Sequence, residues 1–371
     1  MRNLLIQLHK YAGLFLGLIL SISALSGSLL VFDRELDELL TPATVDFDPY
    51  DEWASFNLAL ENATAAVNNG TSPTRLMTGR HERAPHIIRF PTPPGEAGPL
   101  EARMDPGTGE VLALRQWGRT PVSWIYHLHM AFFAGSAGEL VVGLMGFLMV
   151  FFCITGVIIW WPRAGRWRRA LTLKRDAGAF RFFYDLHQML GIYMLPVYFV
   201  VALSGMQLIW HDPAEHAVST LLPVRETPSP VSSLPTNSAI LPLTADEAAV
   251  VGQAQFPESR LMRLYVPASH TAVWRVTFVH PEERWTEFGA GTTVYLDQYS
   301  GEVLDIWNTR DLPAGSTMLE WSFPLHNGDA LGIVGRLIVL LSGLLIPILF
   351  GSGTYLWWRK RNPKPVASGP A

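Results

Sequence analysis

The sequence of 371 residues has a single cysteine, Cys153, and only 16% charged residues. One cysteine excludes a disulfide framework and any zinc or iron–sulfur site built from several cysteines. Soluble domains carry about 25% charged residues, so the low charge argues against an ordinary cytosolic enzyme. The net charge of −4 leaves no overall basic surface, and we expect no nucleic-acid partner. Cys153 lies in an apolar run and is expected to be a small core residue.

Patterns of common soluble enzymes are also missing. The chain has no strand–GxGxxG–helix unit, so it encodes no nicotinamide or flavin domain. No serine stands in a G-x-S-x-G context, so hydrolase chemistry has no support.

Long apolar runs are abundant in this chain, which is 49% apolar and has a mean hydropathy of +0.20. Each run holds roughly 20 residues or more, enough to cross a hydrocarbon layer of about 30 Å. The first run is about twice as long as that of a signal peptide, so we expect it to be retained. The four predicted spans are Leu4–Phe32, Leu140–Trp161, Leu186–Trp210 and Leu337–Trp358.

Basic residues set the predicted direction of these spans. The stretch Arg163–Arg181 holds seven basic residues against one aspartate, and both ends of the chain are also basic. The positive-inside rule therefore places both termini and this loop in the cytoplasm. The connections 34–122 and 212–318 are then outside, which predicts a multi-pass protein of the bacterial inner membrane with two periplasmic domains.

Both outer segments contain the pattern of a strand, a glycine-containing turn and a second strand, which predicts small α+β domains. The matching pieces are Asp105–Leu112 and Asp297–Leu304. The predicted organisation is 1–33 transmembrane helix 1, 34–122 first outer domain, 123–162 transmembrane helix 2 with a periplasmic lead-in, 163–181 basic loop, 182–211 transmembrane helix 3, 212–318 second outer domain, 319–360 transmembrane helix 4 with a lead-in, and 361–371 cytoplasmic tail.

The sequence contains an internal duplication. Leu8-His9-x3-Gly13 matches Leu186-His187-x3-Gly191, and each is followed at the same distance by Ser-Gly. The second and fourth spans match without a gap; their shared positions are Trp124, Leu128, His129, Gly135, Gly146, Gly156, Trp160 and Trp161 with Trp321, Leu325, His326, Gly332, Gly343, Gly353, Trp357 and Trp358. Both copies start inside, so they are parallel repeats with sites expected on the repeat interface.

The duplication pairs four histidines at two levels of the membrane. His9 and His187 are expected near the cytoplasmic face, and His129 and His326 near the periplasmic face. Two ligands that approach one metal from opposite sides suit haem iron, whereas zinc prefers about four ligands. Copper or a proton relay remains an alternative. Gly13 and Gly191 lie one helical turn from their histidines and leave room for a flat macrocycle.

Other polar residues near these histidines have several interpretations. His127 has Pro324 as its repeat partner, so it can be the true outer ligand, a supporting partner or a substrate contact. Glu139 and Arg336 are equivalent positions that can form an ion pair or mark the membrane surface, and Arg336 can instead bind a haem propionate.

Two further expectations concern the ends of spans. Ser136-Ala-Gly-Glu139 fits a capping box, which would start the second span there. His211 and His216 have no repeat partners and are expected to be surface residues.

These features resemble the PepSY-associated transmembrane protein family over nearly the whole chain. The resemblance rests on the opening Leu8–Leu14, the four spans, the outer hairpins and the Trp-Trp-Arg or Trp-Trp-Pro endings. It implies an α-helical membrane protein, a four-transmembrane-helix bundle of two parallel repeats, each with a small α+β PepSY-like periplasmic domain. Within the family, the sequence resembles inner-membrane ferric-siderophore reductases of the ferrioxamine type, which carry two b-type haems. Their ligand role maps onto His9, His187, His129 and His326, and His127 departs from the pattern.

The resemblance implies a dihaem reductase. An unidentified cytoplasmic or membrane donor would supply electrons, which would cross the membrane to a periplasmic Fe(III)–siderophore and release iron as Fe(II). No catalytic residue is expected beyond the haem ligands. Acidic outer segments weakly favour a cationic substrate. Three alternatives are a PepSY interaction protein with structural histidines, a siderophore or ion permease, and a b-type cytochrome that serves a quinone.

Overall fold

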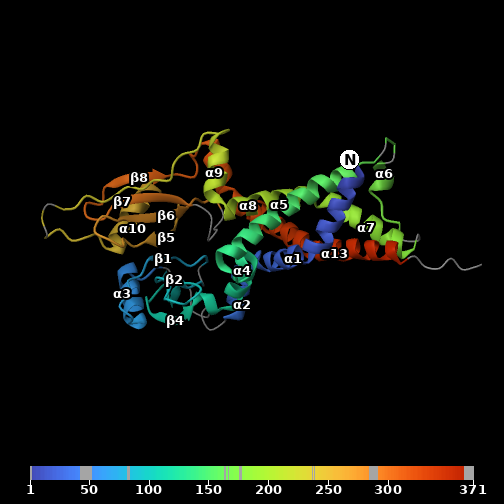
Figure 1. The fold of residues 1–371 in the computed structure, drawn as a ribbon. Helices are drawn as coiled ribbons and strands as arrows, with labels where there is room; N and C mark the ends of the chain where they lie inside the picture. Colours follow the sequence, from blue (N-terminus) through green and yellow to red (C-terminus); the bar gives the residue numbers. More distant parts are fainter. Residues whose placement is uncertain are drawn as a thin grey trace, which may run out of the picture. The chain divides into compact units, whose positions relative to one another are not determined.

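The computed structural model of the chain describes residues 2–41, 52–81, 84–162, 164–165, 167–174, 178–235, 237, 239–283 and 291–362. The chain forms two compact units. The helical unit comprises Met1–Phe32, Ile125–Ala214 and Ser322–Ala371, and the sheet unit comprises Asp33–Trp124 and Glu215–Trp321 (Figure 1). The predicted tail beyond residue 362 and parts of the basic loop lie outside the described residues.

Long apolar helices make up the helical unit. Among the described residues, three helical segments are long and apolar enough to cross a membrane. They are α1 (Arg2–Leu30), α5 (Gly135–Trp160) and Asp329–Arg361, which contains η3 (Asp329–Leu331) and α13 (Gly332–Arg361). The shorter helices are α4 (Pro121–Ala131), α6 (Trp167–Ala170), α7 (Ala179–Tyr193), α8 (Leu195–Ile209), α9 (His211–Ser219) and α12 (Ser322–Asn327). The protein is therefore a helical membrane protein.

The third predicted span is not one straight helix. It consists of α7 and α8, which are bent by 56° at Met194 and count as a fourth span only if taken together. Pro196, at the start of α8, has no N–H to donate and its ring clashes with the carbonyl of Ile192 in a continuous helix. In the other repeat the position equivalent to Pro196 is Leu18, which does not break a helix, and α1 continues without interruption from Arg2 to Leu30.

The expected capping box at the start of the second span is wrong. Helix α5 begins at Gly135 with Ala134 as its N-cap, no side chain caps it, and both Ser136 and Glu139 are exposed. Gly135 has φ +54°, a conformation that glycine adopts at little cost, so the chain turns between α4 and α5 instead of continuing. Gly328 and Gly332, with φ +87° and +61°, lie at the break between α12 and α13, so both lead-in helices α4 and α12 are separate elements.

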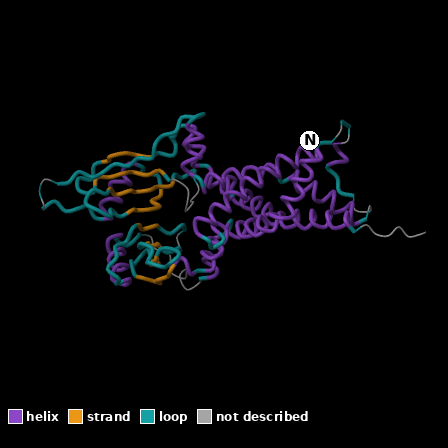
Figure 2. Tube along the Cα trace, in the orientation of Figure 1, coloured by secondary structure: helices purple, strands orange, loops and turns teal. Residues whose placement is uncertain are grey.

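The helices of this unit pack closely through small residues. Helix α1 packs against α13 and α5, α5 against α8, and α13 against α7. Figure 2 colours the helices of this unit purple and the strands of the sheet unit orange. A Cβ on Gly343 of α13 would lie only 2.7 Å from the Ala24 carbonyl of α1, so glycine permits this approach. The buried core of this unit contains Leu20, Met145, Cys153, Tyr198 and Ile346.

The sheet unit contains one antiparallel sheet of eight strands in the order β4-β3-β2-β1-β5-β6-β7-β8. Its strands are β1 (Arg75–Met77), β2 (His86–Arg89), β3 (Leu100–Met104), β4 (Val111–Gln116), β5 (Arg260–Tyr265), β6 (Val273–Val279), β7 (Thr292–Asp297) and β8 (Val303–Trp307). Each outer segment supplies four strands, and β1 pairs with β5 to join the two sets. Helices α3 (Phe56–Val67) and α10 (Ala245–Gln255) supply apolar residues to its core, and η2 (Trp117–Arg119) and α11 (Ala314–Glu320) complete the unit.

The two predicted hairpins are present and turn in the same way. In β3–β4 the Asp105 carboxylate accepts hydrogen bonds from the backbone N–H groups of Gly107 and Thr108. In β7–β8 the Asp297 carboxylate accepts the equivalent bonds from the next turn. Gly109 and Gly301 both have positive φ, which only glycine adopts freely.

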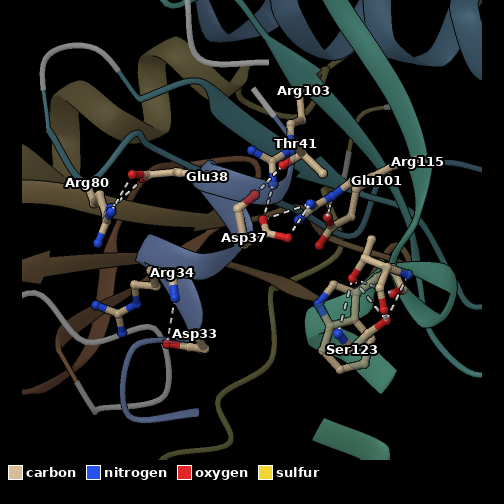
Figure 3. Close-up of polar contacts among 12 residues, drawn as sticks. Asp33, Arg34, Asp37, Glu38, Thr41, Arg80, Glu101, Arg103, Arg115 and Ser123 are labelled. Atoms are coloured by element: carbon tan, nitrogen blue, oxygen red, sulfur yellow. Dashed lines mark hydrogen bonds and ion pairs between the residues drawn. The ribbon is translucent and has the colours of Figure 1, made fainter. Parts of the chain in front are cut away.

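A buried charge cluster fixes α2 (Asp33–Leu40) to the sheet (Figure 3). Arg115 lies between two carboxylates, with nitrogens 2.7 Å from Asp37 and 2.7 Å from Glu101, and Arg89 is also 2.7 Å from Glu101. Burial alone would raise the pKa of Glu101, but Arg115 and Arg89 outweigh it and hold that pKa below its usual value. The carboxylate is therefore ionised inside the fold.

Candidate functional site

Two helices bring His9 and His187 together. His9 is on α1 and His187 on α7, and their ring centroids are 6.5 Å apart with an interplanar angle of 77°. Phe152 of α5 packs edge-on against His9 at 5.0 Å. This is the pair predicted for the cytoplasmic side.

A second pair is formed by the lead-in helices. His129 on α4 and His326 on α12 have ring centroids 6.2 Å apart, with an interplanar angle of 46°. His127 lies two residues before His129 on the same helix, so it points to a different side, and its ring packs against Tyr126. The structure thus places His129 opposite His326.

The two pairs lie at different levels along α1. His129 contacts Ser23 and Gly27, which follow His9 by about four to five helical turns. At 5.4 Å per turn, the levels are roughly 21–27 Å apart along the helix. Each level therefore has its own pair of imidazoles.

Hydrogen bonds fix which nitrogen of each ring carries the proton. Nδ1 of His129, His187 and His326 lies 2.9, 3.0 and 3.0 Å from a backbone carbonyl, of Ser23, Leu349 and Val201 respectively. A carbonyl only accepts, so Nδ1–H must donate and the lone pair is on Nε2. Nδ1 of His9 lies 2.7 Å from the Thr155 hydroxyl, which itself donates to Phe151, so Nδ1 donates here too. All four rings present the tautomer in which Nε2 can bind a metal.

A hydroxyl residue followed by glycine supports each ring. The hydroxyl lies 2.7–3.4 Å from Nδ1. For His187, His129 and His326 an added Cβ on the glycine would lie 3.3 Å or less from the ring, so glycine permits this approach. The four dipeptides are Thr155-Gly156 for His9, Ser352-Gly353 for His187, Ser26-Gly27 for His129 and Ser204-Gly205 for His326. Sequence reasoning found the repeat but missed the roles of Thr155 and Ser352, although the recurrence of this dipeptide at duplicated positions was the available signal.

The spacing of each pair fits two axial ligands of one iron. The centre of a five-membered ring with bonds of about 1.35 Å lies about 1.2 Å from each ring atom. With a metal–imidazole bond of about 2.0 Å, two opposite imidazoles have centroids about 6.4 Å apart. The observed 6.5 and 6.2 Å agree with that value. Among the described residues, no group of three or more His, Cys, Asp and Glu side chains is placed to hold a metal ion.

The predicted glycines beside the inner pair leave room. A Cβ on Gly191 would meet no atom within 4 Å, and one on Gly13 would reach only Phe152, at 4.0 Å. Open space one turn from each inner histidine is compatible with a flat macrocycle against these helices. Contact between these glycines and a haem stays a prediction.

Arg336 has partners other than Glu139. Its guanidinium donates to the Val31 carbonyl at 2.7 and 3.0 Å, stacks 4.2 Å from the ring centre of Phe32 and lies 3.8 Å from Asp329. Glu139 is exposed on α5, so the expected ion pair is not formed in the described part of the chain. A propionate contact by Arg336 stays a prediction.

The two histidines predicted to be surface residues are exposed. His211 and His216 lie on α9, and His211 is 3.6 Å from the carboxylate of its neighbour Asp212. Neither contributes to the two pairs.

Comparison with known proteins identifies the family. An uncharacterized protein of Pseudomonas aeruginosa, PA4219, is 34% identical over 81 residues, which are 22% of this chain. The match spans only 20% of that relative's length. A family model described as the PepSY-associated TM region matches residues 6–360, which confirms the family resemblance of the motifs. The chain therefore belongs to the PepSY-associated transmembrane family.

Proposed function

We propose that this protein is a dihaem reductase of the bacterial inner membrane that delivers electrons to a periplasmic Fe(III)–siderophore. In this proposal the chain has four spans as two parallel repeats, with both termini in the cytoplasm and the sheet unit, to which both PepSY-like segments contribute, in the periplasm. Iron leaves the siderophore as Fe(II), because hard oxygen ligands hold Fe(III) far better than Fe(II). The ferrioxamine type is the siderophore class that the family resemblance favours.

One observation carries this proposal. Two histidine pairs, at two levels of one helical unit, are spaced so that both rings of a pair could bind one iron, and each ring has the tautomer that leaves Nε2 for a metal. Isolated histidines inside a membrane are costly, whereas paired ligands are compensated by coordination. Haem b at each level would supply one-electron redox chemistry.

The chain's own residues position and insulate these sites. Carbonyl and hydroxyl oxygens accept from Nδ1–H, so each imidazole is held in orientation and becomes a stronger donor at Nε2. Phe152 packs against His9 and helps to exclude water at the inner level. The continuous helix α1 sets the separation of the two levels, since it contributes His9 at one and contacts His129 at the other.

The first test is a visible spectrum of the detergent-purified chain, with pyridine haemochrome quantitation. We expect about two haems per chain with low-spin, six-coordinate bands, because each site offers two imidazoles. Protein that binds no haem when supplied with it during expression would refute the proposal, and would leave the PepSY interaction protein as the better explanation.

The second test identifies the acceptor. Chemically reduced protein is mixed anaerobically with Fe(III)–ferrioxamine, with a quinone analogue in a parallel sample, and haem re-oxidation is followed together with trapping of Fe(II) by a chelator. Re-oxidation with release of Fe(II) supports the reductase. Re-oxidation by the quinone alone would replace the siderophore reductase by a b-type cytochrome that serves a quinone.

A further inference from the structure

We infer that Thr155 is the positioning residue of the inner site, whose hydroxyl sets the orientation and tautomer of His9. This inference rests on the proposed function, because it concerns a haem ligand. Thr155 contacts the imidazole of His9 and would not contact the iron itself.

The hydrogen bonding of His9 differs from that of the other three rings. His129, His187 and His326 each have a backbone carbonyl within 3.0 Å of Nδ1, in addition to a serine hydroxyl. Within the described residues, the hydrogen-bond partner of His9 is Thr155 alone, at 2.7 Å. Its orientation therefore depends on one side chain, whereas the other three have a backbone acceptor that no substitution removes.

Thr155 is itself fixed so that it can only accept from His9. Its hydroxyl proton is donated to the Phe151 carbonyl at 2.7 Å, which leaves an oxygen lone pair for Nδ1–H. The side chain is buried, so water is not available as a substitute. A Cβ added to the adjacent Gly156 would lie 3.9 Å from Cε1 of His9, so the ring packs beside this part of α5.

Loss of this hydroxyl has a specific consequence. Without an acceptor for Nδ1–H, the present tautomer and ring orientation lose the hydrogen bond that stabilises them. The proton can then move to Nε2, or the ring can rotate, and either change removes the Nε2 lone pair from the ligand position. A supporting hydrogen bond of this kind typically contributes about 10–100-fold to metal affinity. A hydroxyl is also a weaker acceptor than a carbonyl, so His9 should be the least electron-rich ligand of the four.

The test compares three variants of the full chain: Thr155→Val, Thr155→Ser and Ser352→Ala. Thr155→Val keeps the shape and removes the acceptor, Thr155→Ser restores it, and Ser352→Ala leaves His187 with the Leu349 carbonyl. We measure haem content, low-spin electron paramagnetic resonance signals and a redox titration. A His187→Ala variant identifies which signals belong to the inner site.

We expect Thr155→Val to weaken haem binding at the inner site about 10–100-fold, or to shift that haem's signal and midpoint potential, while the outer haem is unchanged. Thr155→Ser should match the wild type, and Ser352→Ala should change the inner haem less than Thr155→Val, because His187 keeps the Leu349 carbonyl. The outer haem serves as the folding control, since its ligands are untouched. Equal changes at both sites, or wild-type behaviour of Thr155→Val, would overturn the inference. Neither result affects the proposed function, which is tested separately by the haem content of the wild-type chain and by the acceptor that re-oxidises it.

Discussion

Histidines with side-chain hydrogen bonds occur in both units of this protein, half-buried in the helical unit and buried in the sheet unit, and they are bonded differently. In the helical unit, four rings donate from Nδ1 and leave Nε2 available. In the sheet unit, Nδ1 of His86 accepts from the Gly79 N–H at 3.0 Å, so its proton is on Nε2. His280 uses both nitrogens, with Ser259 at 2.7 Å and Thr292 at 2.8 Å.

The comparison shows that burial does not identify a ligand. His86 and His280 are at most 3% exposed, so both are thoroughly buried. Yet His86 has its proton on the nitrogen that would have to bind a metal, and His280 has no nitrogen left over. What distinguishes the helical unit is the combination of pairing across helices and an acceptor for Nδ1–H.

The largest expected effect comes from removing one ligand of the inner pair. His187→Ala should lose the inner haem and keep the outer one, so that haem content falls from about two to about one per chain. His280→Ala is the control, since it removes a histidine that is buried even more fully than His187, but in the sheet unit, and should leave haem content unchanged. Full haem content in His187→Ala would show that the inner pair does not hold a haem.

A similar contrast separates neighbouring residues on α4. His129→Ala should lose the outer haem, because its ring faces His326, whereas His127→Ala should retain it. Haem quantitation on both variants decides the point, and the opposite result would assign the outer ligand to His127. Any decrease in substrate turnover by His127→Ala with both haems present would favour the predicted substrate contact.

Sequence reasoning predicted the pairing of histidines better than the path of the helices. The duplication was visible because ligand positions and glycines recur at fixed offsets, and the structure brings His9 to His187 and His129 to His326. The break at Met194 was missed because hydropathy does not change there, although Pro196 was the signal. The joining of both outer segments into one sheet through β1 and β5 depends on long-range pairing that local strand patterns do not encode.

Glycine substitutions beside the outer pair should disturb it, whereas a methyl group beside His9 should be tolerated. A Cβ on Gly27 would lie 2.6 Å from Cε1 of His129, and one on Gly205 would lie 2.8 Å from Cε1 of His326. Either ring must then move, so Gly27→Ala and Gly205→Ala should weaken outer haem binding or alter its low-spin signal. Gly156→Ala is the control, since its Cβ would be 3.9 Å from His9, an ordinary contact. An unaltered outer signal in both Gly27→Ala and Gly205→Ala would mean that these rings are not held where the structure has them.

The smallest effect concerns His86 and does not involve haem. Burial lowers the pKa of His86 to about 3, with Arg260 adding to the shift, whereas the unfolded chain has a value near 6.5. The unfolded state then binds more protons between these two pH values, so stability of the sheet unit should fall as pH falls below about 6.5. The expected slope is about 1.4 kcal/mol per pH unit for this one group.

Protonation of His86 is best measured between about pH 6.5 and 4.5. Ordinary carboxyl groups have pKa values near the lower end of this range, and the pKa of Glu101 is lower than the usual value. Thermal unfolding followed by the β-sheet circular dichroism signal measures the stability in this range. His86→Leu should be less stable at pH 7, since the Gly79 N–H loses its acceptor, but its pH slope should be shallower. An equal slope in both proteins would show that His86 is protonated readily in the fold. The contrast between the two units would then rest on pairing alone, because the nitrogen that carries the proton would no longer separate structural histidines from ligands.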